Sequence, residues 1–306
     1  MTSIIKKVPV PICGVALGSA ALGNLLLTWS PQLRILFGCI SAILILLAVL
    51  KLICYPSAVA EELKSPIPLN IACTFDMALM LLSVYAKPFI PGVARTVWYF
   101  AILMHVVLIL CTTKRYVFKF DLKNIHASWY VTYVGIVVAA VTAPAWSRTD
   151  IGTVAFWFGF VALLILLVVV TVRYVKYPVP APAKPVFCIY AAPMSLCIAG
   201  YVQSVQPKSA TFLTAMVVAA FILYVAGIIQ MLRCIRGPFF PSFASFTFPF
   251  TISGIASIQA SACLASLGSP IAILRPWGTV QAVITTVLTS YVIFKYVVFL
   301  TSDPQK

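Results

Sequence analysis

The chain has 306 residues, of which 62% are apolar and only 9% are charged, whereas a soluble domain carries about 25% charged residues. This composition, with a mean hydropathy of +1.08, excludes a soluble protein and indicates an integral membrane protein. The net charge of +15 is explained by basic residues placed around membrane spans, and we expect no nucleic-acid partner.

Ten apolar segments, each long enough to cross a hydrocarbon core about 30 Å thick, follow one another along the chain. They are residues 9–28, 34–54, 67–86, 94–113, 126–146, 151–173, 185–204, 210–233, 239–266 and 276–300. We expect one transmembrane domain over residues 1–306, because the longest polar connection is too short to fold alone. The first span is interpreted as a retained helix, since its apolar sequence continues beyond any signal-peptide cleavage point.

Basic residues are distributed unequally between the two sides of these spans. If the N-terminus is cytoplasmic, the Lys and Arg residues that fall outside are only Arg34, Lys87, Arg95, Arg148, Lys208 and Arg275. The predicted outer ends also carry Trp29, Trp98, Trp146 and Trp277. Both features follow the positive-inside rule and the aromatic belt. We therefore predict a multi-pass protein of the cell membrane, of the bacterial inner or plasma membrane type, with both termini in the cytoplasm.

The odd-numbered spans differ in composition from the even-numbered spans. Even spans such as "ISAILILLAVLKLIC" are almost entirely apolar and are typical of lipid-facing helices. The odd spans carry, in chain order, Gly14 and Gly18, Asp76, Thr132, Pro193, and Ser245 with Pro249. Irregular positions near Ala16, Asp76, Thr132, Pro193 and Pro249 recur at a spacing of 56 to 61 residues. This spacing predicts five helical hairpins, each with one inner and one outer helix.

Five inner helices of this kind would surround a central path. Proline inside a helix removes a hydrogen bond, and in lipid the freed carbonyl needs another partner, so such helices face protein or a wet cavity. Small and hydroxyl-bearing side chains permit close packing or offer polar groups to a solute. The alternative is a solid bundle in which the small residues serve packing alone.

No motif of an enzyme is present. The chain has no glycine-rich phosphate loop, no nucleophile elbow and no HExxH sequence. Its two histidines, His105 and His126, cannot form a metal site by themselves, and its nine cysteines are typical of small packing residues. We therefore expect neither an enzyme nor a bound cofactor or metal.

Five short motifs resemble the tellurite-resistance/dicarboxylate transporter family, which includes bacterial TehA and the slow anion channel of plant guard cells. In chain order they are "GVALGSAALG", "AEELKSP", "IHASWYV", "APMSLCIAGY" and "FASFTFPFT". The resemblance covers all ten spans in order. It implies an all-helical membrane protein of five hairpins with quasi-fivefold symmetry, a central pore lined by the odd helices, and a homotrimer.

The resemblance also implies a pore gate. In this family a phenylalanine of the ninth helix plugs the pore, and that role corresponds here to Phe248, directly before Pro249. An aromatic ring across a narrow path excludes ions because no polar atom replaces their lost hydration; the alternative is an ordinary packed ring. Phe75 precedes Asp76 as Phe248 precedes Pro249, so we hypothesise that Phe75 narrows the same constriction.

Asp76 is the only acidic residue well inside a span. A mid-membrane charge costs about 2.5–3.5 kcal/mol on insertion scales, so this side chain should face the bundle interior. Three interpretations stay open: a protonated hydrogen-bonding acid, a proton-coupling group, or an ion-paired structural acid. At the cytoplasmic start of the fifth span, Lys123 and His126 either draw anions towards the pore mouth or serve only topology and anionic lipid.

These observations predict a passive channel for small monovalent anions such as chloride or nitrate. Because no basic residue lies deep in an odd span, selectivity would come from hydroxyls, helix-end dipoles and pore width. The alternatives are a proton-coupled secondary carrier for C4-dicarboxylates, or an exporter of oxyanions or sulfite. A non-transporting membrane scaffold is a third class, which the irregular odd spans make the least favoured.

Overall fold

The computed structural model describes residues 2–302, and the regular elements within them are all helices. Five inner segments follow the predicted odd spans: α2 (Ile12–Leu26), α5 (Pro66–Ala86), α7 (Trp129–Tyr133) with α8 (Val137–Thr142) and η3 (Ala143–Trp146), η4 (Ala181–Ala191) with α10 (Pro193–Ser204), and η5 (Pro241–Phe246) with α12 (Phe248–Ser266). Five outer helices follow the even spans: α3 (Pro31–Cys54), α6 (Pro91–Thr112), α9 (Thr149–Lys176), α11 (Ala210–Cys234) and α13 (Leu274–Thr301). The short elements are α1 (Thr2–Lys7), α4 (Pro56–Glu62), η1 (Thr113–Val117) and η2 (Leu122–Asn124).

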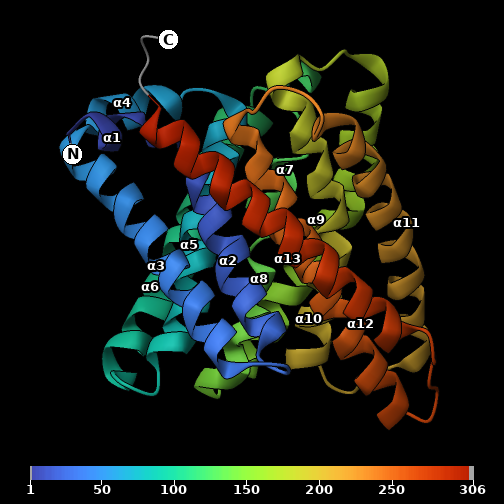
Figure 1. Ribbon diagram of the computed structural model, residues 1–306. Coiled ribbons are helices and arrows are strands. Elements are labelled where there is room, and N and C mark those ends of the chain that lie inside the picture. Colours follow the sequence, from blue (N-terminus) through green and yellow to red (C-terminus); the bar gives the residue numbers. More distant parts are fainter. Residues whose placement is uncertain (1, 303–306) are drawn as a thin grey trace.

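Each inner segment packs against the outer helix that follows it in the chain, as α2 does on α3 and α12 does on α13. The inner segments also contact one another in a closed order, from α2 to α5, to α7 and α8, to α10, to α12 and back to α2. Figure 1 shows the resulting bundle, with α13 crossing its front. The chain order of the hairpins is therefore also their order around the bundle.

Burial separates the two sets of helices. In the 18-residue apolar window within residues 181–204, 89% of residues are buried, whereas 28% are buried in the corresponding window of α11. The outer helices expose rows of Leu, Ile, Val and Phe, which is the surface expected for contact with lipid. The compositional difference between odd and even spans thus corresponds to a difference between protein-facing and outward-facing helices.

Eight helices within residues 2–302 are long and apolar enough to cross a membrane. Two further apolar helices, Ile12–Leu26 and Val137–Trp146, are shorter and belong to the first and fifth predicted spans. The structure therefore agrees with an all-helical integral membrane protein, while the number of ten spans stays a prediction.

The two ends of the described chain lie at the same end of the bundle (Figure 1). Lys7 Nζ at the end of α1 donates a hydrogen bond of 2.6 Å to the carbonyl of Ser302, directly after α13. A chain that crosses the bundle an even number of times has this arrangement.

Three of the inner segments are interrupted, and two are continuous. The interruptions fall after Tyr133, before Pro193 and at Thr247, whose φ and ψ angles are −98° and −86°. Helices α2 and α5 run without a break through Ala16 and Asp76, contrary to the expected irregularity there. Neither residue removes a backbone hydrogen bond as proline does, so the helix continues.

Hydroxyl groups satisfy the backbone groups that these interruptions release. The Ser195 and Ser253 hydroxyls each donate to the carbonyl of Ala191 at 3.0 Å. At the ninth segment, Thr247 Oγ1 lies 2.8 Å from the carbonyl of Ala244 and 3.1 Å from that of Gly14. These three hydroxyls therefore stabilise broken helices, as the absence of water in lipid requires.

Candidate functional site

A cavity of about 50 Å³ lies between the inner segments, and all five of them contribute to its wall. We call it the central cavity. Of the predicted site residues its wall contains Gly14, Pro193, Ser245, Phe248 and Pro249, and α5 adds Ile71, Thr74 and Met77. The lining residues, all within the described chain, are uncharged, and few of them are polar. Because one water needs roughly 10–15 Å³ of cavity volume, the central cavity has room for a few waters.

Phe248 lies between the central cavity and a second, larger one. This second cavity, of about 340 Å³, has a largely apolar lining that also contains Asn24, Arg34, Gln203 and Gln259, and we call it the vestibule. Among residues 2–302, only Leu196 and Phe248 border both cavities. Phe248 is the first residue of α12 and is 7% exposed. Its ring therefore occupies the boundary at which a path between the two cavities would pass.

Gly18 sets how closely α2 approaches the start of α12. A Cβ atom at Gly18 would lie 2.8 Å from the backbone nitrogen of Phe248 and in hard contact with the side chain of Thr247. Gly18, predicted to line the path or to mark a kink, is not part of the lining of the central cavity. Its missing side chain makes room for the irregular turn that positions Phe248. At Gly14 an added Cβ would meet Ala244 Cβ at 3.3 Å, a much smaller conflict.

We expect Gly18→Ala to destabilise the protein by about 1–3 kcal/mol, because the added methyl group overpacks a site closed by backbone atoms. Gly14→Ala is the matched control, since it adds the same methyl group to the same helix against a less crowded neighbour. Thermal unfolding of the two purified variants in detergent measures the difference. Equal midpoints for the two variants would show that Gly18 does not determine the approach of α2 to α12.

Phe75 does not lie with Phe248, and the prediction that it narrows the same constriction is wrong. Its side chain lines a separate pocket of about 300 Å³, together with Cys13, Lys51 and Met104. Successive residues of an α-helix are turned by about 100°, so with Thr74 facing the central cavity Phe75 points away from it. Phe248 follows the irregular residue Thr247, so the two rings do not occupy equivalent positions.

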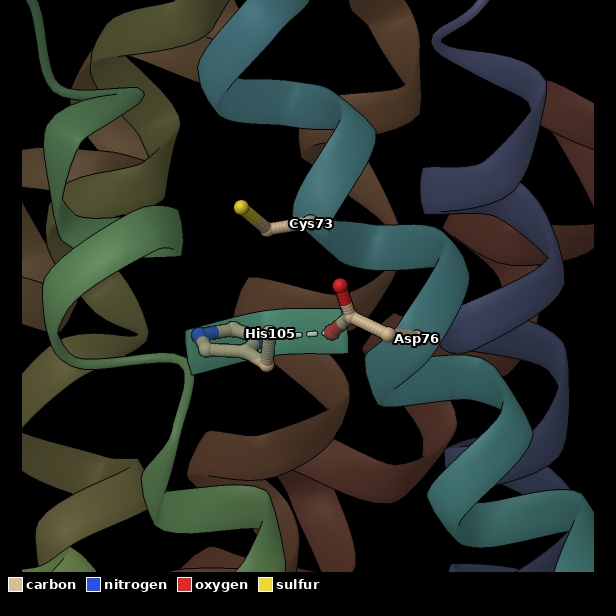
Figure 2. Close-up of side chains that lie close together, drawn as sticks. All are labelled: Cys73, Asp76 and His105. Atoms are coloured by element: carbon tan, nitrogen blue, oxygen red, sulfur yellow. Dashed lines mark hydrogen bonds and ion pairs between the residues drawn. The ribbon is translucent and has the colours of Figure 1, made fainter. Parts of the chain in front are cut away.

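Asp76 pairs with a histidine from the neighbouring outer helix (Figure 2). Its Oδ1 meets Nδ1 of His105 on α6, and Nε2 of His105 lies 2.9 Å from the carbonyl of Thr132. All three residues are fully buried. Because a carbonyl only accepts, Nε2 carries a proton. The remaining proton lies between the ring and the carboxyl group, so the pair has no net charge whichever of them holds it.

Thr132 owes its free carbonyl to the break in the fifth segment. The N–H groups of Val134 and Gly135 both bond to the carbonyl of Tyr130, so the α-helical ladder ends at this point. The ring N–H of His105 donates to the Thr132 carbonyl, where a backbone N–H would donate in a continuous helix. Asp76 and Thr132, each predicted to line the path or to mark a kink, therefore lie behind the wall of the central cavity and not in its lining.

The predicted pore-mouth residues lie near the start of α7 and do not line the central cavity. His126, which precedes α7, is buried, and its Nδ1 has no hydrogen-bond partner. Lys123 is exposed, with its ammonium group 5.8 Å from the centre of the Tyr177 ring.

Arg34 and His105 are the residues that the sequence interpretation missed. The guanidinium group of Arg34 lies 4.2 Å above the Tyr85 ring, and its Nε donates to Asn24 Oδ1 at 3.2 Å. These contacts hold a positive charge at the vestibule, where we had counted Arg34 only as one of several outer charges. For His105 a signal existed: it and Asp76 are ionisable residues deep in consecutive spans.

A comparison with known protein families identifies one that covers nearly the whole chain. The voltage-dependent anion channel family matches residues 7–297, from the end of α1 to the last turn of α13. No individual curated protein matches the chain. The family match confirms the resemblance to tellurite-resistance/dicarboxylate transporters and indicates an anion channel or transporter. By a match that spans nearly its whole length, the chain belongs to the voltage-dependent anion channel family.

Proposed function

We propose that the protein is a passive channel for small monovalent anions, chloride- or nitrate-like, and that Phe248 closes its path. The observation that supports this most directly is that Phe248 borders both the central cavity and the vestibule. An apolar ring at such a boundary imposes a dehydration barrier on any ion that passes. Rotation of one side chain would join the two cavities.

The same proposal includes an architecture. Residues 1–306 form one domain of ten spans in five hairpins, with quasi-fivefold symmetry and both termini in the cytoplasm. The closed order of contacts among the inner segments and the shared end of the two termini support it. Assembly as a homotrimer in a plasma membrane follows from the family resemblance.

Weak binding is the proposed basis of selectivity. The lining of the central cavity offers the hydroxyls of Thr74 and Ser245 and no charged group. An anion in the central cavity loses part of its hydration without gaining a strong partner. The barrier to entry is therefore highest for anions that bind water strongly. This favours weakly hydrated monovalent anions over divalent oxyanions and dicarboxylates.

Arg34 is proposed to raise the anion concentration at the vestibule. We expect Arg34→Gln to lower the current at low anion concentration by roughly two- to fivefold, which corresponds to about 0.5–1 kcal/mol of lost attraction. The difference should shrink in high salt, because screening weakens the same attraction. Arg95→Gln is the matched control, since Arg95 is exposed on the same predicted side but lines neither cavity. Equal currents from the two variants would contradict the role of Arg34.

A proton-coupled carrier is the second candidate, and the Asp76–His105 pair favours it. The pair is buried beside the central cavity and can hold or release a proton. The carrier would move C4-dicarboxylates, or export oxyanions or sulfite, against a gradient.

Flux into liposomes that contain the purified protein separates the two candidates. A channel passes anions only down the combined voltage and concentration gradient, whereas uphill movement driven by a proton gradient identifies a carrier. A panel from chloride and nitrate to sulfite and malate identifies the substrate. If Asp76→Asn leaves transport and its pH dependence unchanged, the proton-coupled mechanism is excluded.

A further inference from the structure

Three metal-ligating side chains meet behind the wall of the central cavity (Figure 2). Cys73 and Asp76 of α5 and His105 of α6 each offer one ligand atom, and these atoms lie within 4.8 Å of one another. We propose that this group, the buried triad, binds a thiophilic divalent cation of the zinc class. The expectation of no metal site assessed the histidines and the cysteines separately, and did not foresee that α5 brings Cys73 and Asp76 to His105.

The helix geometry brings the ligands of the triad to one place. Cys73 and Asp76 are three residues apart and therefore share a face of α5. Figure 2 shows the Asp76 carboxyl group pointing at the His105 ring and the Cys73 side chain on the same side of α5, above the ring. Asp76 Oδ2 is fully buried without a hydrogen-bond partner, and Cys73 Sγ has only a weak contact with Thr132 Oγ1 at 3.6 Å. Sulfur, nitrogen and carboxylate oxygen are the ligands that zinc takes in proteins.

A second layer of hydrogen bonds orients the histidine. Nε2–H of His105 donates to the Thr132 carbonyl, which leaves Nδ1 as the ring nitrogen that faces the carboxyl group. A metal-binding histidine almost always donates its other ring N–H in this way. The Thr132 hydroxyl itself donates to Asn70 Oδ1 at 2.6 Å, so its lone pairs remain available for a fourth ligand bond.

Charge balance permits the ion in a membrane interior. The Cys73 thiolate and the Asp76 carboxylate carry two negative charges, and neutral His105 adds none, so a divalent cation makes the site neutral. On binding, the S–H and O–H bonds break, the metal–sulfur and metal–oxygen bonds form, and two protons pass to solvent. No electrons are transferred. A neutral site avoids the large cost of an unpaired charge in a low-dielectric interior.

The triad lies next to the central cavity, which supplies its access route. Thr74 and Met77, each the chain neighbour of a triad residue on α5, line that cavity. A bound ion would tie α5 to α6, and through Thr132 to the broken fifth segment. We therefore expect zinc to lower anion flux. This effect on flux rests on the proposed function, whereas the binding of the metal is independent of it.

The test is metal titration of the purified full-length protein, stripped with a chelator, with the exposed Cys39, Cys54 and Cys111 replaced by serine. Zinc and cobalt are the probes. We expect one ion bound per chain, about two protons released on binding at neutral pH, and a thiolate-to-cobalt charge-transfer band. Cys73→Ser should abolish the band and weaken zinc binding by more than ~100-fold, beyond the effect of losing an outer-layer group.

Cys188→Ser is the matched control, because Cys188 is equally buried in an inner segment but has no acidic or histidine ligand grouped with it. It should leave zinc affinity, the band and proton release unchanged. Absence of zinc binding, or binding that survives Cys73→Ser, would overturn the site. Both outcomes leave the anion flux of the metal-free protein untouched, so the failure of the metal site is distinguishable from the failure of the channel.

Discussion

Replacing Phe248 by alanine should raise the anion current by at least ~10-fold, the change expected when a barrier falls by about 1.4 kcal/mol. The ring borders the central cavity and the vestibule, so its removal would join them and let an ion keep more of its hydration. Current across a planar bilayer, at matched protein density, measures the effect.

Phe75→Ala is the matched control for this experiment. It removes the same ring from another inner helix, but that ring lines a pocket separate from the central cavity. We expect its current to stay close to that of the unmodified protein. A Phe248→Ala current that equals the Phe75→Ala current would refute the assignment of Phe248 as the gate.

His105→Ala should lower the stability of the folded protein by about 3–5 kcal/mol, the cost of breaking a buried pair by removing one partner. The substitution leaves both the Asp76 carboxyl group and the Thr132 carbonyl without their partner. In a membrane interior no water replaces that partner. The midpoint of thermal unfolding in detergent is the measurement, with anion flux as a second readout.

His126→Ala is the control, because the ring of His126 is also buried but its Nδ1 has no hydrogen-bond partner. His126→Ala should lower the midpoint of thermal unfolding less than His105→Ala does. The loss for Asp76→Asn should lie between these two values, since an amide N–H still donates to Nδ1 of His105. Equal losses for His105→Ala and His126→Ala would mean that the Asp76–His105–Thr132 contacts add nothing to stability.

The pairing of Asp76 also changes what the residue means for conduction. An isolated ionised carboxylate beside the path would repel anions, which would conflict with a channel. The neutral Asp76–His105 pair removes that conflict, since neither distribution of the shared proton places a net charge behind the cavity wall. Of the three sequence interpretations, the hydrogen-bonded acid and the ion-paired acid describe the two protonation forms of this one pair.

The sequence by itself determined the membrane class, the division into inner and outer segments and the family. These properties depend on local composition, because an apolar stretch favours lipid and a proline or glycine acts on its own helix. The placement of Pro193, Ser245, Phe248 and Pro249 at the central cavity follows from the same signals, since each lies at or near a helix break.

Only the tertiary structure decided which side chains share a site. Thr74 and Phe75 are consecutive residues of α5, and consecutive helical residues are turned by about 100°. Thr74 therefore lines the central cavity, whereas Phe75 points away from it. His105 meets Asp76 and Thr132 across three different elements of the chain, and no local pattern encodes such contacts. The physical reason is that helix rotation and the exact point of each break depend on packing between segments, which composition does not specify.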